Sequence, residues 1–482
     1  MKLVFWMICA CALHAQTVSE WVFGGPDHRL HYLPDGRGNT IMDFSSAGYR
    51  GGGVKLPVAA VCQRLAPAPG DDTARIQAAL DHATGAVVLS AGEYEVAGTL
   101  RIAHSGVVLR GEKGAAIRLT GRPHCFLELR GEGTWREEGP PAPVLDAYVP
   151  AGATSFRVRG ASAFHTGDHV LVLRPLTAQW MHSMGLAKPG SDSPPGADSV
   201  IRIDRVVDSV EGDRVTLDAP LSDALDSPFT SASLVRYSFA GRIAEAGVEG
   251  LRLAAAFDDQ ASAPTQTTVL RMDAVEDGWA RDLEIEDAQN GIAIGPGAKR
   301  LTLTNIHIAH SAAHSGSATR ADFALQGTQI LLDRCRVTGE SNWPAVVRPG
   351  AVGPLVVLNF SADHGGVAAD QPWATGLLAD GGKFPGGTQA EPGVAFTSAI
   401  GWSVAWNASS PFLLVLRPAG ALNWCIGCVG APVTVEGTPS GIFDSLGKPV
   451  LLPSLYLQQL RDRLGPDAVR NIGYTDSLTK FL

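Results

Sequence analysis

The chain has 482 residues, of which 45% are hydrophobic and 18% charged, so it is long enough to bury a large core and is not disordered. Its formal net charge is −9, and its Lys and Arg residues are scattered without forming a basic stripe, which argues against nucleic acid as a partner. The 55 glycines and 31 prolines, spread among short apolar runs, favour many short strands joined by turns over a bundle of helices.

The N-terminus has the pattern of an export signal. Lys2 supplies a positive charge, Leu3–Leu13 an apolar run, and Ala15 a small residue before a cleavage site. The apolar run is too short to span a bilayer, and no later stretch is long enough, so we expect no membrane span. A lipoprotein signal at residues 8–11 is the weaker alternative. We therefore expect residues 1–15 to be a signal peptide and the protein to be secreted or periplasmic.

A short helix is predicted after an irregular, extended N-terminal segment at 16–69. Asp71, Asp72 and Thr73 are residues that cap helix N-termini, and the two acidic side chains suit the positive end of the helix dipole. Apolar residues then recur at helical spacing and would form one buried face: Ile76, Ala79, Leu80 and Ala83.

The periodicity changes to that of strands directly after this helix. Runs of three to five residues alternate with Gly or polar corners between 86 and 120, and no Asn-Gly hairpin turn separates them. The same texture returns between 241 and 450, where apolar residues alternate in runs spaced two to three dozen residues apart. Such a pattern is typical of a β-solenoid, in which stacked coils bury a core that no single coil could bury.

Three segments carry a resemblance to a known family. Asp71-Asp-Thr-Ala-x-Ile-Gln-Ala-Ala-Leu80, Val87-Val-Leu-Ser-Ala-Gly-Glu-Tyr94 and Val107-Val-Leu-Arg-Gly111 resemble the opening of the pectin-lyase-like superfamily. More narrowly, they are similar to its rhamnogalacturonase/epimerase-like pectate lyase domain branch. The resemblance implies an all-β protein, a right-handed parallel β-helix whose N-terminal end is plugged by the helix. It implies no single activity, because this branch includes lyases, hydrolases, epimerases and non-catalytic tail-fibre-like proteins.

The remaining domain boundaries are placed where this pattern of short apolar runs changes. The first coils and their capping helix are expected at 70–140, and antiparallel strands with turns predict a β-rich insertion at 141–240 that could wall one side of a groove. The main β-helix should cover 241–450, and a helix with leucines partly along one face predicts a helical tail at 451–482. Asn290, Asn305 and Asn359 lie beside strands, where stacked Asn residues at coil corners are structural, so we leave them out of the chemistry.

Two groups of polar residues in the later coils are candidates for a site. The first follows a strand ending at Ile308 and contains His307, His310, His314, Arg320 and Asp322. His307 alternates with inward Ile306 and Ile308 and should point outward. Histidines in the loop could act as acid or base near neutral pH, and the alternative is a set of locally hydrogen-bonded surface residues.

The second group contains Asp363, His364, Asp370, Trp373 and Lys383, which follow a strand at 355–360. Two carboxylates, a histidine and an aromatic ring are what a sugar-cleaving groove needs, although loop solubility and a core tryptophan explain them as well. Arg348 could pair with a uronate carboxylate, or could be an ordinary corner arginine.

Aromatic rings and cysteines leave further alternatives open. Trp180 in the insertion could stack on a sugar, whereas the alternation in Trp402-Ser-Val-Ala-Trp406, and Trp424 nearby, fits core filling at least as well. Cys425 and Cys428 have the spacing of a redox or metal pair, but no second pair or nearby His completes a zinc site, so we favour buried thiols over a disulfide or a metal.

These residues support a secreted enzyme that acts on an acidic polysaccharide, and a lyase is favoured over a hydrolase by a small margin. In β-elimination, His314 or His364 would be the base and Arg348 or Ca²⁺ would neutralise the uronate carboxylate; no Ca²⁺ loop is recognisable, so no cofactor is certain. In hydrolysis, Asp363 and Asp370 would be the paired carboxyl groups. We expect catalysis from His314, Asp322, Arg348, Asp363, His364 and Asp370, and substrate binding by Trp373, Lys383 and Trp180. A non-catalytic glycan-binding or structural solenoid is the third reading.

Overall fold

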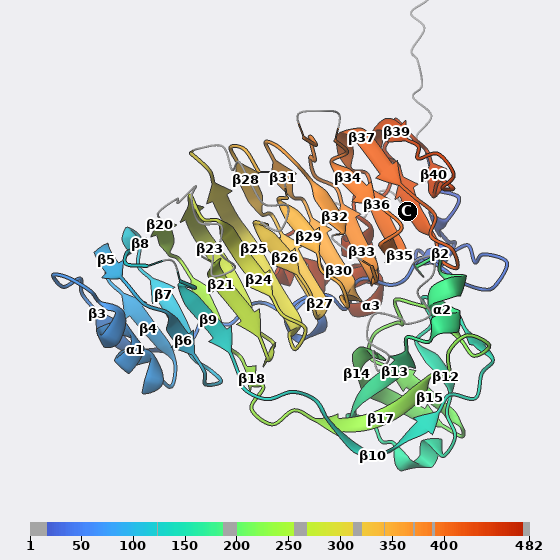
Figure 1. The fold of residues 1–482 in the computed structure, drawn as a ribbon, viewed down its shortest axis with the longest axis horizontal. Coiled ribbons are helices and arrows are strands. Elements are labelled where there is room, and N and C mark those ends of the chain that lie inside the picture. The colour runs from blue at the N-terminus through green and yellow to red at the C-terminus, as the bar shows by residue number, and fades with distance from the viewer. Residues whose placement is uncertain are drawn as a thin grey trace, which may run out of the picture.

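The computed structural model describes residues 17–122, 124–186, 200–254, 268–311, 321–341, 343–369, 372–387 and 391–475. These residues form a right-handed parallel β-helix with an antiparallel insertion, as the sequence predicts (Figure 1). The coils follow one another from the blue N-terminal end to the orange C-terminal end, and the green insertion lies below the later coils.

Each full coil contributes strands to three faces, which we call flanks one, two and three. Flank one contains β3 Val61–Leu65, β4 Ala86–Leu89, β7 Val108–Gly111, β19 Gly247–Glu249, the first halves of β23 Trp279–Glu286 and β25 Lys299–Ala309, β27 Thr328–Asp333, β30 Val352–Leu358, β33 Ala374–Asp380, β36 Ser403–Trp406, β38 Asn423–Ile426 and β40 Ile442–Asp444. Short strands extend it: β18 Ile243–Ala244, β22 Val275–Glu276 and β35 Ile400–Gly401.

The other two flanks complete each coil. Flank two contains β5 Gly92–Val96, β8 Ala115–Leu119, β20 Arg252–Ala254, the second halves of β23 and β25, β28 Arg336–Thr338 and β31 Ser361–Ala362. Flank three contains β6 Leu100–Ile102, β9 Leu127–Arg130, β21 Thr268–Asp273, β24 Asn290–Ile294, β26 Phe323–Leu325, β29 Ala345–Val347, β32 Val367–Ala369, β34 Val394–Phe396, β37 Ser409–Val415 and β39 Val429–Val433. Successive coils pair in parallel on all three flanks, so each residue lies beside its counterpart in the next coil.

The bend between flank one and flank two is made by residues in the left-handed conformation. Asn305, Asn359 and Asn407 have φ values of 55°, 50° and 47° and lie at this bend in their coils. Asn adopts this conformation more readily than most side chains because its amide can hydrogen-bond nearby backbone or side-chain groups. The prediction that Asn305 and Asn359 are structural is confirmed: their side-chain amides bond Asp282 and Tyr474.

The interior of the coils is filled by stacked apolar side chains. One row runs through Leu303, Leu332, Val357, Ala379 and Ala405, in register from coil to coil, and all of these side chains are buried. Cys425 continues the row, and Cys428 is buried in the same cluster. Both are free thiols, as favoured from the sequence.

The helix α1 Thr73–Asp81 covers the N-terminal end of the coils. Its buried residues Ile76, Ala79 and Leu80 belong to the same core cluster as the first strands. Asp72 is the N-cap residue, but the carboxylate that accepts the Thr73 amide at 2.9 Å belongs to Asp71. The expected capping helix is therefore present.

Flank one is covered on the outside by both ends of the chain. The N-terminal segment contains β1 Val22–Gly24, β2 Leu30–Tyr32 and the 3-10 turn η1 Tyr49–Gly51, and the C-terminal tail contains α3 Leu455–Leu464 and α4 Pro466–Asn471. Phe44 packs in one buried cluster with Tyr456 and Leu378, and its amide donates to Gln459 Oε1 at 2.9 Å. The tail thus packs along the side of the coil and closes this flank to solvent.

The insertion is an antiparallel unit between β9 and β18. Its elements are β10 Arg136–Pro143, β11 Tyr148–Val149, β12 Ser155–Arg157, the 3-10 turn η2 Ala161–Ala163, β13 His169–Pro175, α2 Ala178–Ser183, β14 Val200–Glu211, β15 Arg214–Leu217, β16 Leu225–Asp226 and β17 Ser233–Ser238. Six of these strands form one sheet in the order β10-β17-β13-β14-β15-β12. Because β10 starts at Arg136, the unit begins before the expected boundary at 141.

Buried charges join the insertion to the coils. Asp204 on β14 accepts hydrogen bonds from Lys299 Nζ at 2.7 Å, Arg242 at 2.9 Å and the Tyr237 hydroxyl at 2.7 Å. Burial alone would raise the pKa of Asp204, but the charges of Lys299 and Arg242 outweigh it and hold that pKa well below its usual range. The carboxylate therefore stays ionised at the junction and fixes the insertion beside the later coils.

Candidate functional site

Flanks two and three, not flank one, are where a ligand can reach the coils. The outer face of flank one is occupied by the N-terminal segment and α3, as described above. Flank two presents ionisable side chains, and flank three lies between two corners that carry polar residues. A surface site on the coils therefore lies on these two flanks or at their shared corner.

A row of polar residues crosses the outer face of flank two. His307, Arg336, Ser361 and Lys383 occupy matching positions in four successive coils. Neighbouring strands lie about 4.8 Å apart, so these side chains stand in line at the spacing of one coil. The guanidinium of Arg336 and the ammonium of Lys383 are exposed.

His307 points outward, as the alternation in the sequence predicts, and is held in place by two hydrogen bonds. Its Nδ1 lies 2.8 Å from Glu284 Oε2 in the preceding coil, and its Nε2 lies 2.8 Å from Thr338 Oγ1 in the following coil. Its side chain keeps 33% exposure. Since both ring nitrogens have partners, His307 is a positioned surface histidine.

Four residues on flank two and at its corner with flank three form what we call the corner patch: Arg336 and Lys383 on the flank, and Asp363 and His364 at the corner. Asp363 follows β31 directly, its carboxylate lies 3.8 Å from the Arg336 guanidinium, and it accepts a 3.3 Å hydrogen bond from the Gly339 amide. Both side chains of the Arg336–Asp363 pair are about half exposed, so the pair contributes little stability and leaves the Arg336 charge accessible.

The glycines beside His364 allow the corner to turn tightly. A Cβ on Gly366 would lie 1.8 Å from the Gly393 carbonyl oxygen, so only glycine fits there. The Gly365 amide donates to the Gly386 carbonyl of the next coil at 2.8 Å. The partly exposed imidazole of His364 is thus carried on a corner whose backbone is fixed by the coil beyond it.

Asp322 lies at the same corner but is buried. Its Oδ1 is 2.8 Å from His310 Nε2, and its Oδ2 accepts a 2.6 Å hydrogen bond from Ser341 Oγ. The Asp322 and His310 side chains are 3% and 1% exposed. This placement ties consecutive corners together and keeps the Asp322 carboxylate away from a polymer on the surface.

The opposite edge of flank three carries Arg348 and Gln326. The Arg348 amide donates to the Leu325 carbonyl at 2.8 Å, and Gln326 Nε2 donates to the Pro349 carbonyl at 2.6 Å. Between this edge and the corner patch lies one three-residue strand per coil, which spans roughly 10 Å. Its outward residues are small, namely Ala324, Val346 and Ala368 in register, and we call them the floor of flank three. They are only 4–9% exposed, and Trp343 packs against Ala324 and Val346.

The structure corrects the two tryptophans that were expected to bind substrate. Trp180 and Trp373 are only 4% and 6% exposed, and their ring centroids lie 6.1 Å apart in an edge-to-face contact. The indole nitrogen of Trp373 donates to Asp223 at 2.7 Å. Because their rings pack the insertion against the coils, neither presents a free face to a sugar.

Two predicted catalytic residues, His314 and Asp370, lie outside the described residues, as does Arg320. Of the others, Asp363, His364 and Lys383 come together in the corner patch, while Arg348 lies on the far edge of flank three. Trp402, Trp406 and Trp424 are buried, so the core-filling interpretation is correct.

Sequence reasoning missed Arg336, although a signal was present. In Arg334-Cys-Arg-Val337 the apolar residues Cys335 and Val337 are buried inward, so alternation places Arg336 outward. Residues of the insertion that meet the coils could not be found this way, because no periodicity relates them to the coil.

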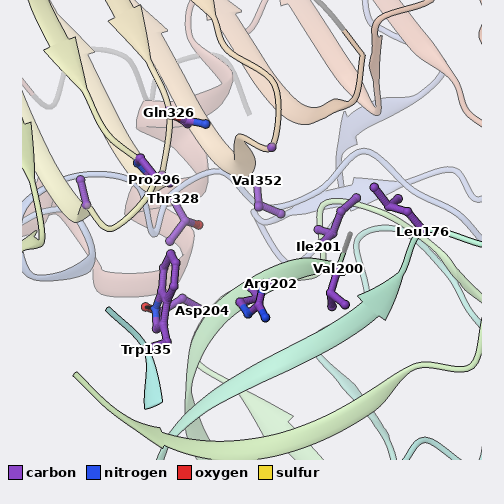
Figure 2. A pocket seen from close by; sticks show the side chains of 13 residues that line it. Trp135, Leu176, Val200, Ile201, Arg202, Asp204, Pro296, Gln326, Thr328 and Val352 are labelled. Atoms are coloured by element: carbon purple, nitrogen blue, oxygen red, sulfur yellow. Dashed lines mark hydrogen bonds between the residues drawn. The ribbon is translucent and has the colours of Figure 1, made fainter. Parts of the chain in front are cut away.

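A cavity of about 250 Å³ lies where the insertion meets the coil corners (Figure 2). Trp135, Arg202 and Asp204 come from the insertion side, and they face Gln326, Thr328 and Val352 from the coils. Leu176, Val200 and Ile201 add an apolar wall on the insertion side. The prediction that the insertion could wall one side of a groove agrees with this placement.

Neither a metal cluster nor a membrane helix is found in the described ranges. Over those ranges no group of three or more His, Cys, Asp or Glu side chains is arranged to hold a metal ion. The helices within them also lack the length and apolar character needed to cross a bilayer.

Comparison with solved structures finds similar folds at low identity. The tailspike protein gp49 from Pseudomonas phage LKA1 matches with a TM-score of 0.41 and 13% identity over 78% of this chain and 72% of that one. The Gp54 tailspike of Acinetobacter baumannii bacteriophage AP22, in complex with capsular saccharide, gives 0.36 and 11% over 78% and 63%. The A-module of the mannuronan C-5 epimerase AlgE6 of Azotobacter vinelandii gives 0.32 and 12% over 79% and 74%. No protein-family model and no curated protein matches the sequence.

Proposed function

We propose that this protein is a secreted enzyme that cleaves a uronate-containing polysaccharide by β-elimination at the corner patch. The observation that carries the proposal is the position of His364 directly after Asp363, whose carboxylate lies 3.8 Å from the exposed Arg336 guanidinium. A second exposed cation, Lys383, lies one coil further along, in register with Ser361. A base and a neutralising cation are the two groups that this reaction needs.

In the proposed reaction, His364 removes the proton from the carbon beside the uronate carboxyl group. Arg336 and Lys383 stabilise the charge that then builds up on the carboxylate. The electron pair forms a carbon–carbon double bond, the glycosidic oxygen leaves, and that oxygen takes a proton from water. The products are an unsaturated uronate end and a new reducing end.

Asp363 has a positioning part in this proposal. Its carboxylate lies 3.8 Å from the Arg336 guanidinium and accepts a hydrogen bond from the Gly339 amide, so it ties that guanidinium to the corner that carries His364. The role first given to Arg348 passes to Arg336, because Arg348 lies across the floor of flank three. Ca²⁺ bridging a carboxylate remains an alternative to these cations, and adding a chelator to the assay distinguishes the two.

The test is an ultraviolet assay for the unsaturated uronate product on pectic, alginate and glycosaminoglycan polymers. Absorbance that rises with time on at least one polymer supports the proposal. New reducing ends without that absorbance would instead indicate a glycoside hydrolase using paired carboxylates. Binding of a polymer without either product would indicate a non-catalytic glycan-binding solenoid.

A further inference from the structure

The cavity between the insertion and the coils is separate from the corner patch. It opens beside Gln326 and Gly350, at the edge of flank three opposite His364, and the floor residues Ala324 and Val346 lie between the two places. Its volume of about 250 Å³ is formed by two units that are far apart in sequence, β14 of the insertion and the coil corners. Nothing in the proposed reaction uses it.

A cation lies on the rim of the cavity. Arg202 has a side chain 40% exposed and forms a loose ion pair with the carboxylate of Glu137, 3.9 Å away. A second cation lies behind the wall: Arg205 is fully buried and donates to Thr328 Oγ1, which lines the cavity, at 3.0 Å.

Neutral groups satisfy the Arg205 guanidinium. It donates to the carbonyls of Asp204, Ala219, Pro220 and Gly353 and to the Thr328 hydroxyl. Within the described ranges no carboxylate oxygen lies within ion-pair distance of it, and burial lowers its pKa. The carboxylates of Asp218 and Asp204 act on it from beyond that distance and offset part of its positive charge.

The carboxylate in the wall is part of a buried group of charges. Asp204 is paired with Lys299 and Arg242, and its remaining hydrogen bonds come from the Tyr237 hydroxyl and from Trp135 Nε1 at 3.1 Å. Arg242 also lies 3.4 Å from the Glu276 carboxylate, so the two cations and the two carboxylates of this group balance in charge. Among the residues that line the cavity, Arg202 is the cation that a ligand can reach.

The walls are otherwise apolar, which excludes a small inorganic anion as the best fit. Trp135, Leu176, Val200 and Ile201 line one side, and Gln326 supplies an amide on the other. The hydrogen bond to Asp204 fixes the orientation of the Trp135 indole. A ligand that suits this lining has an apolar ring face, hydroxyl groups and one carboxylate, which describes a uronate sugar.

We propose that this cavity binds one uronate residue of an acidic saccharide, with its carboxylate at Arg202 and its ring against the apolar wall. The inference rests on the proposed function for the class of polymer, but not for the reaction. A chain that crosses the floor of flank three could then be held here while a neighbouring sugar lies at His364. The insertion would then contribute one side of the polymer-binding site.

The experiment measures binding by isothermal titration calorimetry, with trisaccharides of galacturonate and of mannuronate as probes and cellotriose as the neutral control. The proteins are the wild type, Arg202→Gln, Val200→Trp, which fills the cavity, and the control Arg214→Gln on β15 of the same insertion. Loss of a charge-assisted contact should weaken binding of the acidic trisaccharide about tenfold in Arg202→Gln. Val200→Trp should abolish it, and Arg214→Gln should leave it unchanged.

Three outcomes would overturn the inference: no binding of either acidic trisaccharide, equal binding of cellotriose, or unchanged binding in both cavity variants. His364→Ala separates this inference from the proposed function. If cleavage never occurs but the cavity variants lose binding, the binding site stands and the lyase proposal fails. If cleavage occurs and the cavity variants bind and cleave as the wild type does, the lyase proposal stands and the binding site fails.

Discussion

Lys299 Nζ lies 2.7 Å from Asp204 Oδ1, and both side chains are buried where the insertion meets the coils. The charge of Lys299, together with that of Arg242, keeps the pKa of Asp204 well below that of an unfolded aspartate, against the opposing effect of burial. The stability from this ionised carboxylate is therefore present above the unfolded pKa and is lost as the pH falls through the folded value.

Replacing Lys299 by Met should destabilise the protein by about 3 kcal/mol, because removing one partner leaves a buried charge less well compensated. Urea denaturation measures the loss. The matched control is Arg118→Gln, whose exposed pairs with Glu93 and Glu95 should contribute less than about 1 kcal/mol. Equal losses in the free energy of unfolding would show that the buried pair contributes no more stability than the exposed pairs do.

Asp380 should make the stability depend on pH near neutrality. Its carboxylate is buried and accepts hydrogen bonds from Ser454 Oγ and the Tyr456 amide, each at 2.7 Å, and burial raises its pKa to about 7. A folded pKa above the unfolded value means that the stability is fully present below the unfolded pKa and is lost as pH rises through the folded one.

The melting temperature should therefore fall between about pH 4 and about pH 7, and Asp380→Asn should remove that part of the slope. Differential scanning calorimetry at a series of pH values measures both. The variant Asp444→Asn, whose carboxylate accepts the Ser19 hydroxyl at a partly buried position, is the control and should keep the slope. A wild-type melting temperature that does not change over this interval would contradict the assignment.

His364→Ala should lower kcat for polymer cleavage by about 100-fold or more, the usual effect of losing a general base. Lys383→Met should lower kcat/KM, because the carboxylate loses one neutralising charge. Both substitutions are on the surface, so melting temperatures should stay within a few degrees of wild type. Activity is measured by the rate of double-bond formation, with Arg118→Gln as the control. Wild-type rates in the His364 variant would remove this residue from the reaction.

Trp373→Phe should lower stability and leave saccharide binding unchanged. The substitution removes the hydrogen bond to Asp223 and leaves that buried acceptor less satisfied, which costs about 1–3 kcal/mol. Calorimetry with the acidic trisaccharides supplies the second readout. A large loss of affinity without a loss of stability would mean that the ring meets the sugar after all.

The coil architecture could be predicted because its signal is local and repeated. Ile306 and Ile308 alternate with His307, and this pattern predicts which side chains point into the coil. Asn305, one residue earlier, marks the bend between two strands. Both signals lie within a few residues of each other. Stacking then follows, because no single coil buries its own core. The helix at Thr73–Asp81 was equally readable from its apolar face.

The candidate site was less predictable because it depends on register between coils and on the insertion. Asp363 and Lys383 could be grouped from the sequence. Arg336 belongs to the same group only because its strand pairs with Ser361, two dozen residues later, and the sequence does not reveal that register. Trp373 looked like a sugar platform, yet its partner Asp223 lies 150 positions away in the insertion. No periodicity encodes such contacts.

The meeting of both chain ends on flank one has a consequence for biosynthesis. Val356, Leu378 and Val404 form a row on the outside of the coils, and within the described residues they belong to one buried cluster with α3, the N-terminal segment and part of the insertion. Until α3 leaves the ribosome, this apolar row lacks part of its cover, although most coils are already made. The nascent protein therefore passes through a late stage vulnerable to aggregation, at which a chaperone would be most useful.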